Sequence, residues 1–181
     1  FHLVGGLDKL RASEVNAKAL RDGRPNSLDR WIEQDGVYCL KVKLRGTDSD
    51  WDLQRTIEVY RIANELLARQ GQTQLHLSAD TNEQCESPDY IVDYLRRLKE
   101  SEPRAYDALL YVEQPTEREL TAHRFDMRAI AKLKPVILDE SLIGLNEMDL
   151  ALALGWSGVA LKTCKGHSMA LLTAARCHMD K

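Results

Sequence analysis

Short apolar runs alternate with longer amphipathic segments along most of this sequence, and this alternation restricts the folds that the chain can adopt. A buried parallel strand is apolar on both faces, whereas the helix that leads to the next strand is apolar along one stripe. The sequence therefore predicts a parallel sheet with crossover helices. The five predicted strands are Val37–Leu44, Thr73–Ala79, Leu109–Val112, Pro135–Leu138 and Gly158–Leu161.

The segments between these runs have the spacing of helices that bury one face. From Trp51 to Arg69, apolar residues recur every three or four positions, and Gly71 follows where glycine commonly ends a helix. Ser87-Pro88 marks another helix start, because serine is a favoured cap and proline a favoured first helical residue. The other predicted helices are Ser27–Gln34, Glu117–Leu133, Asn146–Leu154 and Ser168–His178. No linker divides the chain, so we predict one domain, residues 1–181.

Composition and charge narrow the class of protein. The chain has 44% hydrophobic and 29% charged residues, which is typical of a globular protein and argues against a disordered one. Its net charge of −3 gives no general attraction for nucleic acid or for a membrane surface, so we expect neither as a partner. No apolar run is long enough to span a bilayer. The four cysteines form no Cys-x-x-Cys pair, and we predict reduced thiols in a cytoplasmic protein.

Acidic residues follow three successive predicted strands directly: Asp80, Glu113 and Asp139. Neighbouring parallel strands lie about 4.8 Å apart and end at the same edge of the sheet, so the three carboxylates should lie together. One such acid alone would be read as a helix cap or a surface ion pair. Three together repel one another unless a cation neutralises them, and an all-oxygen site suits a hard divalent ion. The sequence therefore predicts a Mg²⁺ site, with Mn²⁺ as a substitute.

Lysines lie on both sides of these acids. If Lys43 is on the second strand of an eight-stranded barrel, Lys162 follows the sixth, and the two side chains face each other across the ring. A neutral lysine can remove the proton beside a carboxylate if its pKa falls below the usual value of about 10.4. A nearby cation and partial burial both lower that pKa. The predicted chemistry is therefore proton abstraction beside a carboxylate, giving an enolate that magnesium stabilises.

Five motifs, taken in order, resemble those of the enolase superfamily, in particular the muconate-lactonizing subgroup of the mandelate racemase/muconate lactonizing enzyme family. The motifs are Lys41-Val42-Lys43, Asp80-Thr81-Asn82, Glu113-Gln114-Pro115, Asp139-Glu140-Ser141 and Lys162-Thr163-Cys164-Lys165-Gly166. The resemblance implies an α/β fold, a partial (β/α)8 TIM-type barrel with strands two to six and their helices. It also implies that residues 1–181 are an incomplete C-terminal catalytic barrel domain, without the family's capping domain and last barrel units.

The same resemblance implies a role for each motif. The metal ligands would be Asp80, Glu113 and Asp139, the acid/base pair Lys43 and Lys162, and the substrate-binding residues Lys41, Asn82 and Lys165. The expected reactions on a small carboxylate-bearing substrate are racemisation or epimerisation, cycloisomerisation, and β-elimination. We also expect a homo-oligomer. The family usually has a further glycine where this chain has His167, and participation of His167 or Glu140 stays open.

Two other functions fit parts of the sequence. A Schiff-base aldolase also keeps a lysine after its sixth barrel strand, which makes Lys162 a candidate nucleophile that needs no metal. A non-catalytic family member would keep the magnesium site without turnover. The sequence does not identify the substrate, because the selecting loops would lie in the capping domain.

Overall fold

The computed structural model describes residues 1–20 and 22–179, in which strands and helices alternate. The strands are β1 (His2–Val4), β2 (Cys39–Lys43), β3 (His76–Asp80), β4 (Leu109–Glu113), β5 (Val136–Leu138) and β6 (Gly158–Val159). The α-helices are α1 (Leu28–Asp35), α2 (Ser49–Arg69), α3 (Pro88–Ser101), α4 (Pro103–Ala108), α5 (Arg128–Ala131), α6 (Asn146–Ala153) and α7 (His167–Met179). Two short 3-10 helices are Ala12–Glu14 and Thr163–Lys165.

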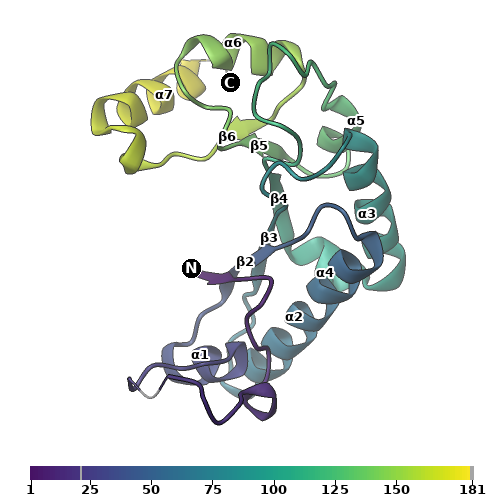
Figure 1. Ribbon diagram of the computed structural model, residues 1–181, viewed down its shortest axis with the longest axis vertical. Coiled ribbons are helices and arrows are strands. Elements are labelled where there is room, and N and C mark those ends of the chain that lie inside the picture. The colour runs from purple at the N-terminus through teal and green to yellow at the C-terminus, as the bar shows by residue number, and fades with distance from the viewer. Residues whose placement is uncertain (21, 180–181) are drawn as a thin grey trace.

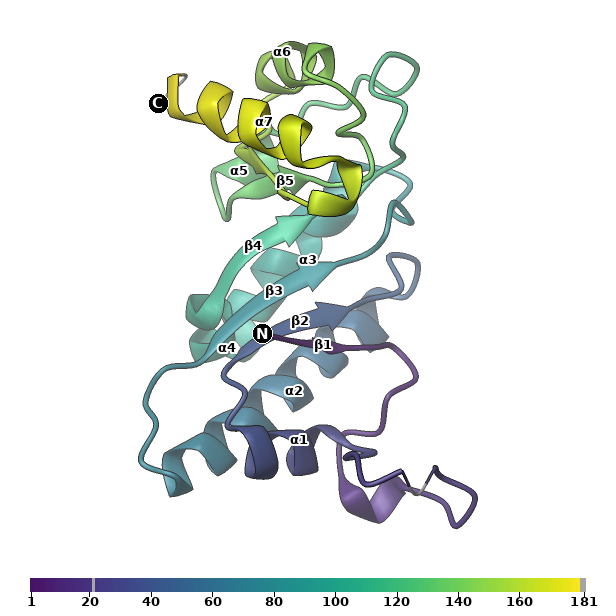
Figure 2. The same cartoon turned by 90° about the vertical axis from the view of Figure 1, so that its left-hand side faces the viewer.

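The strands of the described residues form one parallel sheet in the order β1-β2-β3-β4-β5-β6. A doubly wound sheet reverses its order at a switch point, whereas a (β/α) barrel adds each strand beside the previous one. Figure 1 shows the chain as an open arc with α2, α3 and α4 along its outer side. In Figure 2 the arrows of β2, β3 and β4 point the same way. The predicted partial barrel is therefore confirmed.

Alternation along each strand separates the apolar core from the charged residues. Leu40 and Val42 of β2 and Leu77 of β3 are fully buried in one apolar cluster with the inner faces of α2 and α3. Lys41 and Lys43 alternate with these β2 residues and therefore point to the opposite face of the sheet. The sheet thus buries its apolar side chains under the helices and directs its lysines into the arc.

Most predicted elements are confirmed to within a few residues. Gly71, with a φ of 75°, follows Gln70, the C-cap residue of α2. Ser87 occupies the N-cap of α3, although its side chain makes no cap hydrogen bond. A turn at Gly6 and Leu7 follows β1. No described helix has the length and apolarity that crossing a membrane requires, and all four cysteines are free thiols.

The predicted helix Glu117–Leu133 is wrong over most of its length, because only Arg128–Ala131 is an α-helix there. Residues 117–127 form a connection in which the Arg118 guanidinium donates to Glu83, in the connection after β3. The buried residues Leu120 and Met127 lie seven positions apart without a regular apolar stripe between them. An apolar spacing that does not repeat cannot bury one helical face. The short helix α4 was not predicted.

Candidate active site

The carboxyl ends of the parallel strands bring the predicted charged residues to one edge of the sheet. In the strand register, Lys43 lies opposite Asp80, and Asp80 lies opposite Glu113. Asp139 directly follows β5, and Lys162 lies three residues beyond the end of β6. Sequential strands therefore arrange these side chains in one line across the sheet. We call this set the acid–lysine row: Lys41, Lys43, Asp80, Glu113, Asp139 and Lys162.

At the β2 end of the row, two ammonium groups share one carboxylate. The Nζ of Lys41 lies 2.7 Å from Asp80 Oδ2 and 2.6 Å from Glu113 Oε1, and the Nζ of Lys43 lies 2.5 Å from Asp80 Oδ2. Burial alone would lower the pKa of Lys41, but its hydrogen bonds to the two carboxylates outweigh burial and raise it. Lys41 is therefore a permanent cation between the first two acids.

At the β6 end, Lys162 forms an ion pair with Asp139, and its Nζ lies 3.8 Å from Glu113 Oε1. Burial, together with the Asp80 and Asp139 carboxylates, raises the pKa of Glu113 even though Lys41 opposes the shift. Burial would also raise the pKa of Asp139, but Lys162 and Lys165 outweigh it and lower that pKa. Of these two neighbouring acids, Glu113 therefore holds a proton more readily than Asp139 does.

The surroundings of Lys162 raise its pKa. Burial lowers the pKa of this lysine, but the hydrogen bond and the charge of Asp139 raise it further than burial lowers it. The charge nearest to its ammonium is the Asp139 carboxylate, and the lowered lysine pKa expected beside a bound metal ion stays a prediction. Lys162 is therefore protonated in this arrangement.

The donor chemistry of the row fits a hard cation, because Asp80, Glu113 and Asp139 offer carboxylate oxygens and are all buried. However, within residues 1–20 and 22–179, no group of three or more His, Cys, Asp or Glu side chains is gathered closely enough to hold a metal ion as it stands. The ammonium groups of Lys41 and Lys162 lie against these carboxylates instead. A metal ion and the ammonium groups would therefore compete for the same oxygens.

Two further predicted residues, Asn82 and Lys165, form hydrogen bonds with members of the row. The Oδ1 of Asn82 accepts a hydrogen bond from Lys43 at 2.7 Å, and its Nδ2 donates to Glu140 at 3.3 Å. Glu140, whose participation was left open, therefore reaches Lys43 through one amide. Lys165, predicted to bind substrate, donates to the backbone carbonyl of Asp139. His167 is exposed at the start of α7.

Gln114 is a site residue that sequence reasoning quoted within a motif but gave no role. It is fully buried and has a positive φ of 33°. Its Oε1 accepts hydrogen bonds from the backbone N–H groups of Asp139 at 2.9 Å and Ser141 at 3.1 Å, and its Nε2 donates to Ser141 Oγ at 2.8 Å. Gln114 therefore positions the third acid. In the sequence, Gln114 could have been noticed as a polar residue that lies between the end of a buried strand and Pro115.

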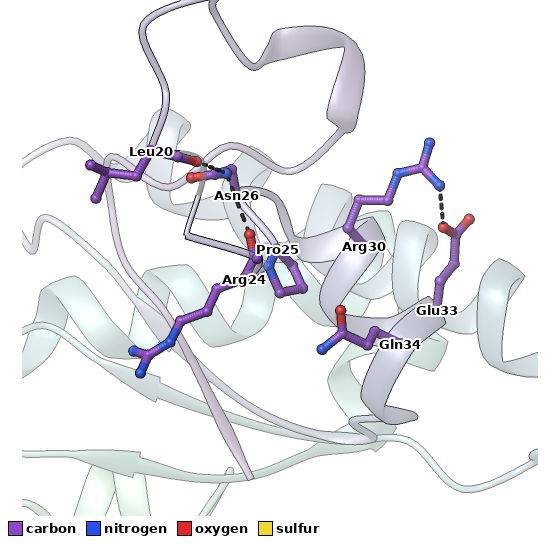
Figure 3. Close-up of a pocket in the computed structure, with 8 residues that line it drawn as sticks. Leu20, Arg24, Pro25, Asn26, Arg30, Glu33 and Gln34 are labelled. Carbon is purple, nitrogen blue, oxygen red and sulfur yellow. Dashed lines mark hydrogen bonds and ion pairs between the residues drawn. The ribbon is translucent and has the colours of Figure 1, made fainter.

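A surface pocket of about 720 Å³ lies elsewhere, in the connection before α1 and on that helix (Figure 3). The Asn26 amide donates to the backbone carbonyls of Leu20 and Arg24, and Arg30 pairs with Glu33. The side chains of Asn26, Arg30 and Glu33 are therefore already engaged in contacts within the protein. The pocket's lining includes no member of the acid–lysine row, and we place the candidate active site at the row.

No protein-family model matches this chain, and no curated protein gives a significant match. Solved structures do match. A mandelate racemase/muconate lactonizing protein from Herpetosiphon aurantiacus has a TM-score of 0.64 at 22% identity, over 83% of this chain and 40% of that one. Muconate lactonizing enzyme from Pseudomonas putida has a TM-score of 0.62 at 18% identity, over 83% and 38%. The enzyme from Klebsiella pneumoniae has a TM-score of 0.56 at 21% identity, over 84% and 39%.

This chain spans about two fifths of the length of these structures, 40% for the Herpetosiphon aurantiacus protein. The shared part contains the parallel strands and the helices between them, and the identities of 18% and 22% make this a likeness of fold. The sequential, parallel strand order found above agrees with it. The chain thus has the fold of a partial barrel like that of mandelate racemase/muconate lactonizing proteins.

Proposed function

We propose that this chain is the catalytic barrel part of an enzyme that removes the proton beside the carboxylate of a small organic acid, with the chemistry of the enolase superfamily. The acid–lysine row supports this proposal. Three buried carboxylates lie between Lys43 at one end and Lys162 at the other. The fold likeness to muconate lactonizing enzymes supports it independently.

Asp80, Glu113 and Asp139 would hold Mg²⁺, whose charge would stabilise the negative charge that develops on the carboxylate of the substrate. These side chains must first release Lys41 and Lys162, because one carboxylate oxygen cannot serve an ammonium and a metal ion equally well. Lys41 keeps its positive charge, since its pKa is raised, and would bind the substrate carboxylate. Asn82 orients Lys43 through its Oδ1.

Lys43 and Lys162 would transfer the proton. A neutral lysine takes the proton from the α-carbon and becomes an ammonium, and the electron pair of the C–H bond passes into the enolate. Return of a proton by the other lysine would invert the stereocentre. If the second lysine instead stays charged beside the enolate, the same first step leads to β-elimination or cycloisomerisation. The row supports this shared first step, and the subsequent reaction depends on the substrate.

The proton transfer is tested by incubating the protein with Mg²⁺ and a panel of small chiral carboxylic acids in heavy water. We expect deuterium at the α-carbon, detected by mass spectrometry. Replacing a general acid or base typically costs 10²-fold to 10⁴-fold, so Lys43→Met and Lys162→Met should each slow exchange by at least about a hundredfold. A borohydride-trapped adduct on Lys162 without any exchange would instead support the Schiff-base aldolase.

Metal binding is tested separately, by electron paramagnetic resonance with Mn²⁺ alone. Asp139→Asn should weaken Mn²⁺ binding by at least about tenfold, because a neutral amide replaces a charged ligand. Asp126→Asn is the matched control, since Asp126 is exposed and pairs with Arg128 outside the row. Equal loss in both variants, or no Mn²⁺ binding by the unaltered chain, would contradict the assignment of the ligands.

A further inference from the structure

The side-chain amide of Asn82 lies between Lys43 and Glu140 and connects the two. Its Oδ1 accepts a hydrogen bond from Lys43 at 2.7 Å, and its Nδ2 donates to Glu140 Oε1 at 3.3 Å. A lysine ammonium has only donors, and a carboxylate has only acceptors. A flipped amide would place two donors together at Lys43 and two acceptors together at Glu140. Both neighbours therefore favour the observed orientation.

The main chain of Asn82 is held by a turn that follows β3. Asn82 and Glu83 have positive φ angles of 48° and 68°, and the N–H of Gln84 donates to the carbonyl of Thr81 to close the turn. The Asn82 N–H also donates to Asp80 Oδ1 at 2.8 Å. The turn therefore fixes where the Asn82 side chain begins, and the groups around its amide decide which way the amide faces.

The carboxylate of Glu140 has no other bonding role among the residues that the structure describes. Its Oε2 is buried without a hydrogen-bond partner, and the Asn82 amide is the one donor to its Oε1. Arg118 lines the same small cavity as Glu140 but pairs with Glu83. Carboxylates withdrawn from water are normally paired with a cation. Glu140 lacks such a pair within these residues, so its contact with Asn82 is its distinguishing interaction.

The orientation of the Asn82 amide decides whether the nitrogen of Lys43 is open to a substrate. Besides its bond to Cε, this nitrogen has three positions, and two of them donate to Asp80 Oδ2 at 2.5 Å and to Asn82 Oδ1 at 2.7 Å. In the neutral amine that takes a proton, the third position holds the electron pair. A flipped amide would donate to that electron pair and block it. A neutral amine no longer opposes the flip, whereas Glu140 still does.

We propose that Glu140 is a positioning residue for Lys43, because it holds the Asn82 amide with its oxygen toward Lys43 and so keeps the electron pair of Lys43 open to the α-proton of the substrate. This role rests on the proposed function, in which Lys43 is a base. Glu140 takes no proton itself and binds neither the metal ion nor the substrate. Its removal should therefore slow proton transfer and leave both binding steps unchanged.

The orientation of the amide is measured without substrate, by nuclear magnetic resonance. The side-chain NH₂ resonances of Asn82 are identified by their loss in Asn82→Ala. In the unaltered chain, these protons should give stronger nuclear Overhauser effects to the γ-protons of Glu140 than to the ε-protons of Lys43. The reverse order would show a flipped amide and overturn the proposal.

Deuterium exchange at the α-carbon of the substrate tests the consequence. Glu140→Ala should slow exchange at least about tenfold, through a lower kcat with KM unchanged, because misorientation costs rate and not binding. Glu140→Gln should recover most of the rate, since its amide oxygen can still accept from Asn82. Glu119→Ala is the matched control and should leave the rate unchanged, because Glu119 is exposed and lines the same cavity, and no described contact joins its side chain to Asn82.

A double variant shows whether Glu140 acts through Asn82. Once Asn82→Ala is present, adding Glu140→Ala should slow exchange no further, and additive losses would overturn the role. Unchanged Mn²⁺ binding should show that Glu140→Ala is folded and that Glu140 is no metal ligand. Full-rate exchange in Glu140→Ala, equal slowing in Glu119→Ala, or lost Mn²⁺ binding in Glu140→Ala overturns this role alone. Absence of exchange in the unaltered chain overturns the proposed function and this role with it.

Discussion

The two halves of the sheet carry similar charged motifs but are built very differently. Strands β2, β3 and β4 are five residues long each, and α2 buries ten residues along its 21. Strands β5 and β6 have three and two residues, and Thr173 is the one buried residue of α7. Leu171 and Leu172 of α7 are exposed. The first half is a packed core, whereas the second presents much of its apolar surface to solvent.

The same contrast runs through the acid–lysine row. The side chain of Lys41, in the first half, is 9% exposed, whereas that of Lys162, in the second half, is 39% exposed. A buried ammonium between two acids has few alternative positions, but a half-exposed one can exchange its carboxylate for water at little cost. The β2 end of the row is therefore held more firmly than the β6 end, which can adjust more readily when a ligand binds.

Cysteine reactivity should show the largest difference between the halves. Burial raises the pKa of the Cys85 thiol to about 12, although a hydrogen bond to Thr81 opposes the shift. At pH 8, about one Cys85 side chain in ten thousand is then the reactive thiolate. Cys164, by contrast, is exposed. Alkylation with iodoacetamide, followed by mass spectrometry, should modify Cys164 at least about a hundredfold faster than Cys85. Similar rates for the two cysteines would contradict the difference in burial.

Core substitutions should show the next largest difference. Leu77 of β3 is fully buried, and Leu77→Ala should lower the free energy of unfolding by about 3 kcal/mol through lost burial and a residual cavity. Leu161, beyond β6, is 51% exposed, and Leu161→Ala should change that free energy by less than about 0.5 kcal/mol. Urea titrations followed by circular dichroism measure both, and equal losses would contradict the contrast.

Buried and exposed carboxylates of the two halves should differ by a smaller amount. Asp52 is buried and accepts hydrogen bonds from the backbone of Arg45 at 2.7 Å and of Gly46 at 2.8 Å and from the Tyr90 hydroxyl at 2.6 Å. Asp52→Ala should lower the free energy of unfolding by about 2 kcal/mol, because it leaves these donors unpaired. Asp149→Ala, which removes the exposed pair with Arg176, should cost less than about 1 kcal/mol. Urea unfolding measures both losses. A larger loss for Asp149→Ala than for Asp52→Ala would contradict this expectation.

Local opening should give the smallest difference. We expect amide hydrogens of β6 and α7 to exchange with heavy water at least about tenfold faster than those of β3 and α2, because few buried contacts hold them. Hydrogen-exchange mass spectrometry on peptides from both regions measures this difference directly. Uniform protection across the sheet would show that the two halves open as one unit.

The helices that were predicted correctly, and the acids of the row, are marked by a regular pattern of neighbouring residues. The helix from Trp51 to Arg69 has an apolar residue every turn, and the acids Asp80, Glu113 and Asp139 each stand directly after an apolar run. Strand order was predicted from the order of the charged motifs, because parallel strands with crossover helices can also form a doubly wound sheet. These features need information from only a few neighbouring residues.

The features that the sequence did not predict depend on residues far apart in the chain. The connection after β4 is tied by Arg118 to Glu83, 35 positions earlier, and no local pattern marks that pair. The pKa of Lys162 depends on its ion pair with Asp139, which only the folded sheet creates. The role of Gln114 depends likewise on backbone groups 25 and 27 positions later.

Gln114 has a mechanical consequence for the site. The pairing of β4 with β5 ends at Glu113 and Ile137, so regular strand pairing does not extend to Asp139. The Gln114 side chain continues that pairing by one step, with its own amide in place of a peptide group. The Gln114 side chain thus helps to set the spacing between the second and third carboxylates, since it ties the end of β4 to the backbone that carries Asp139.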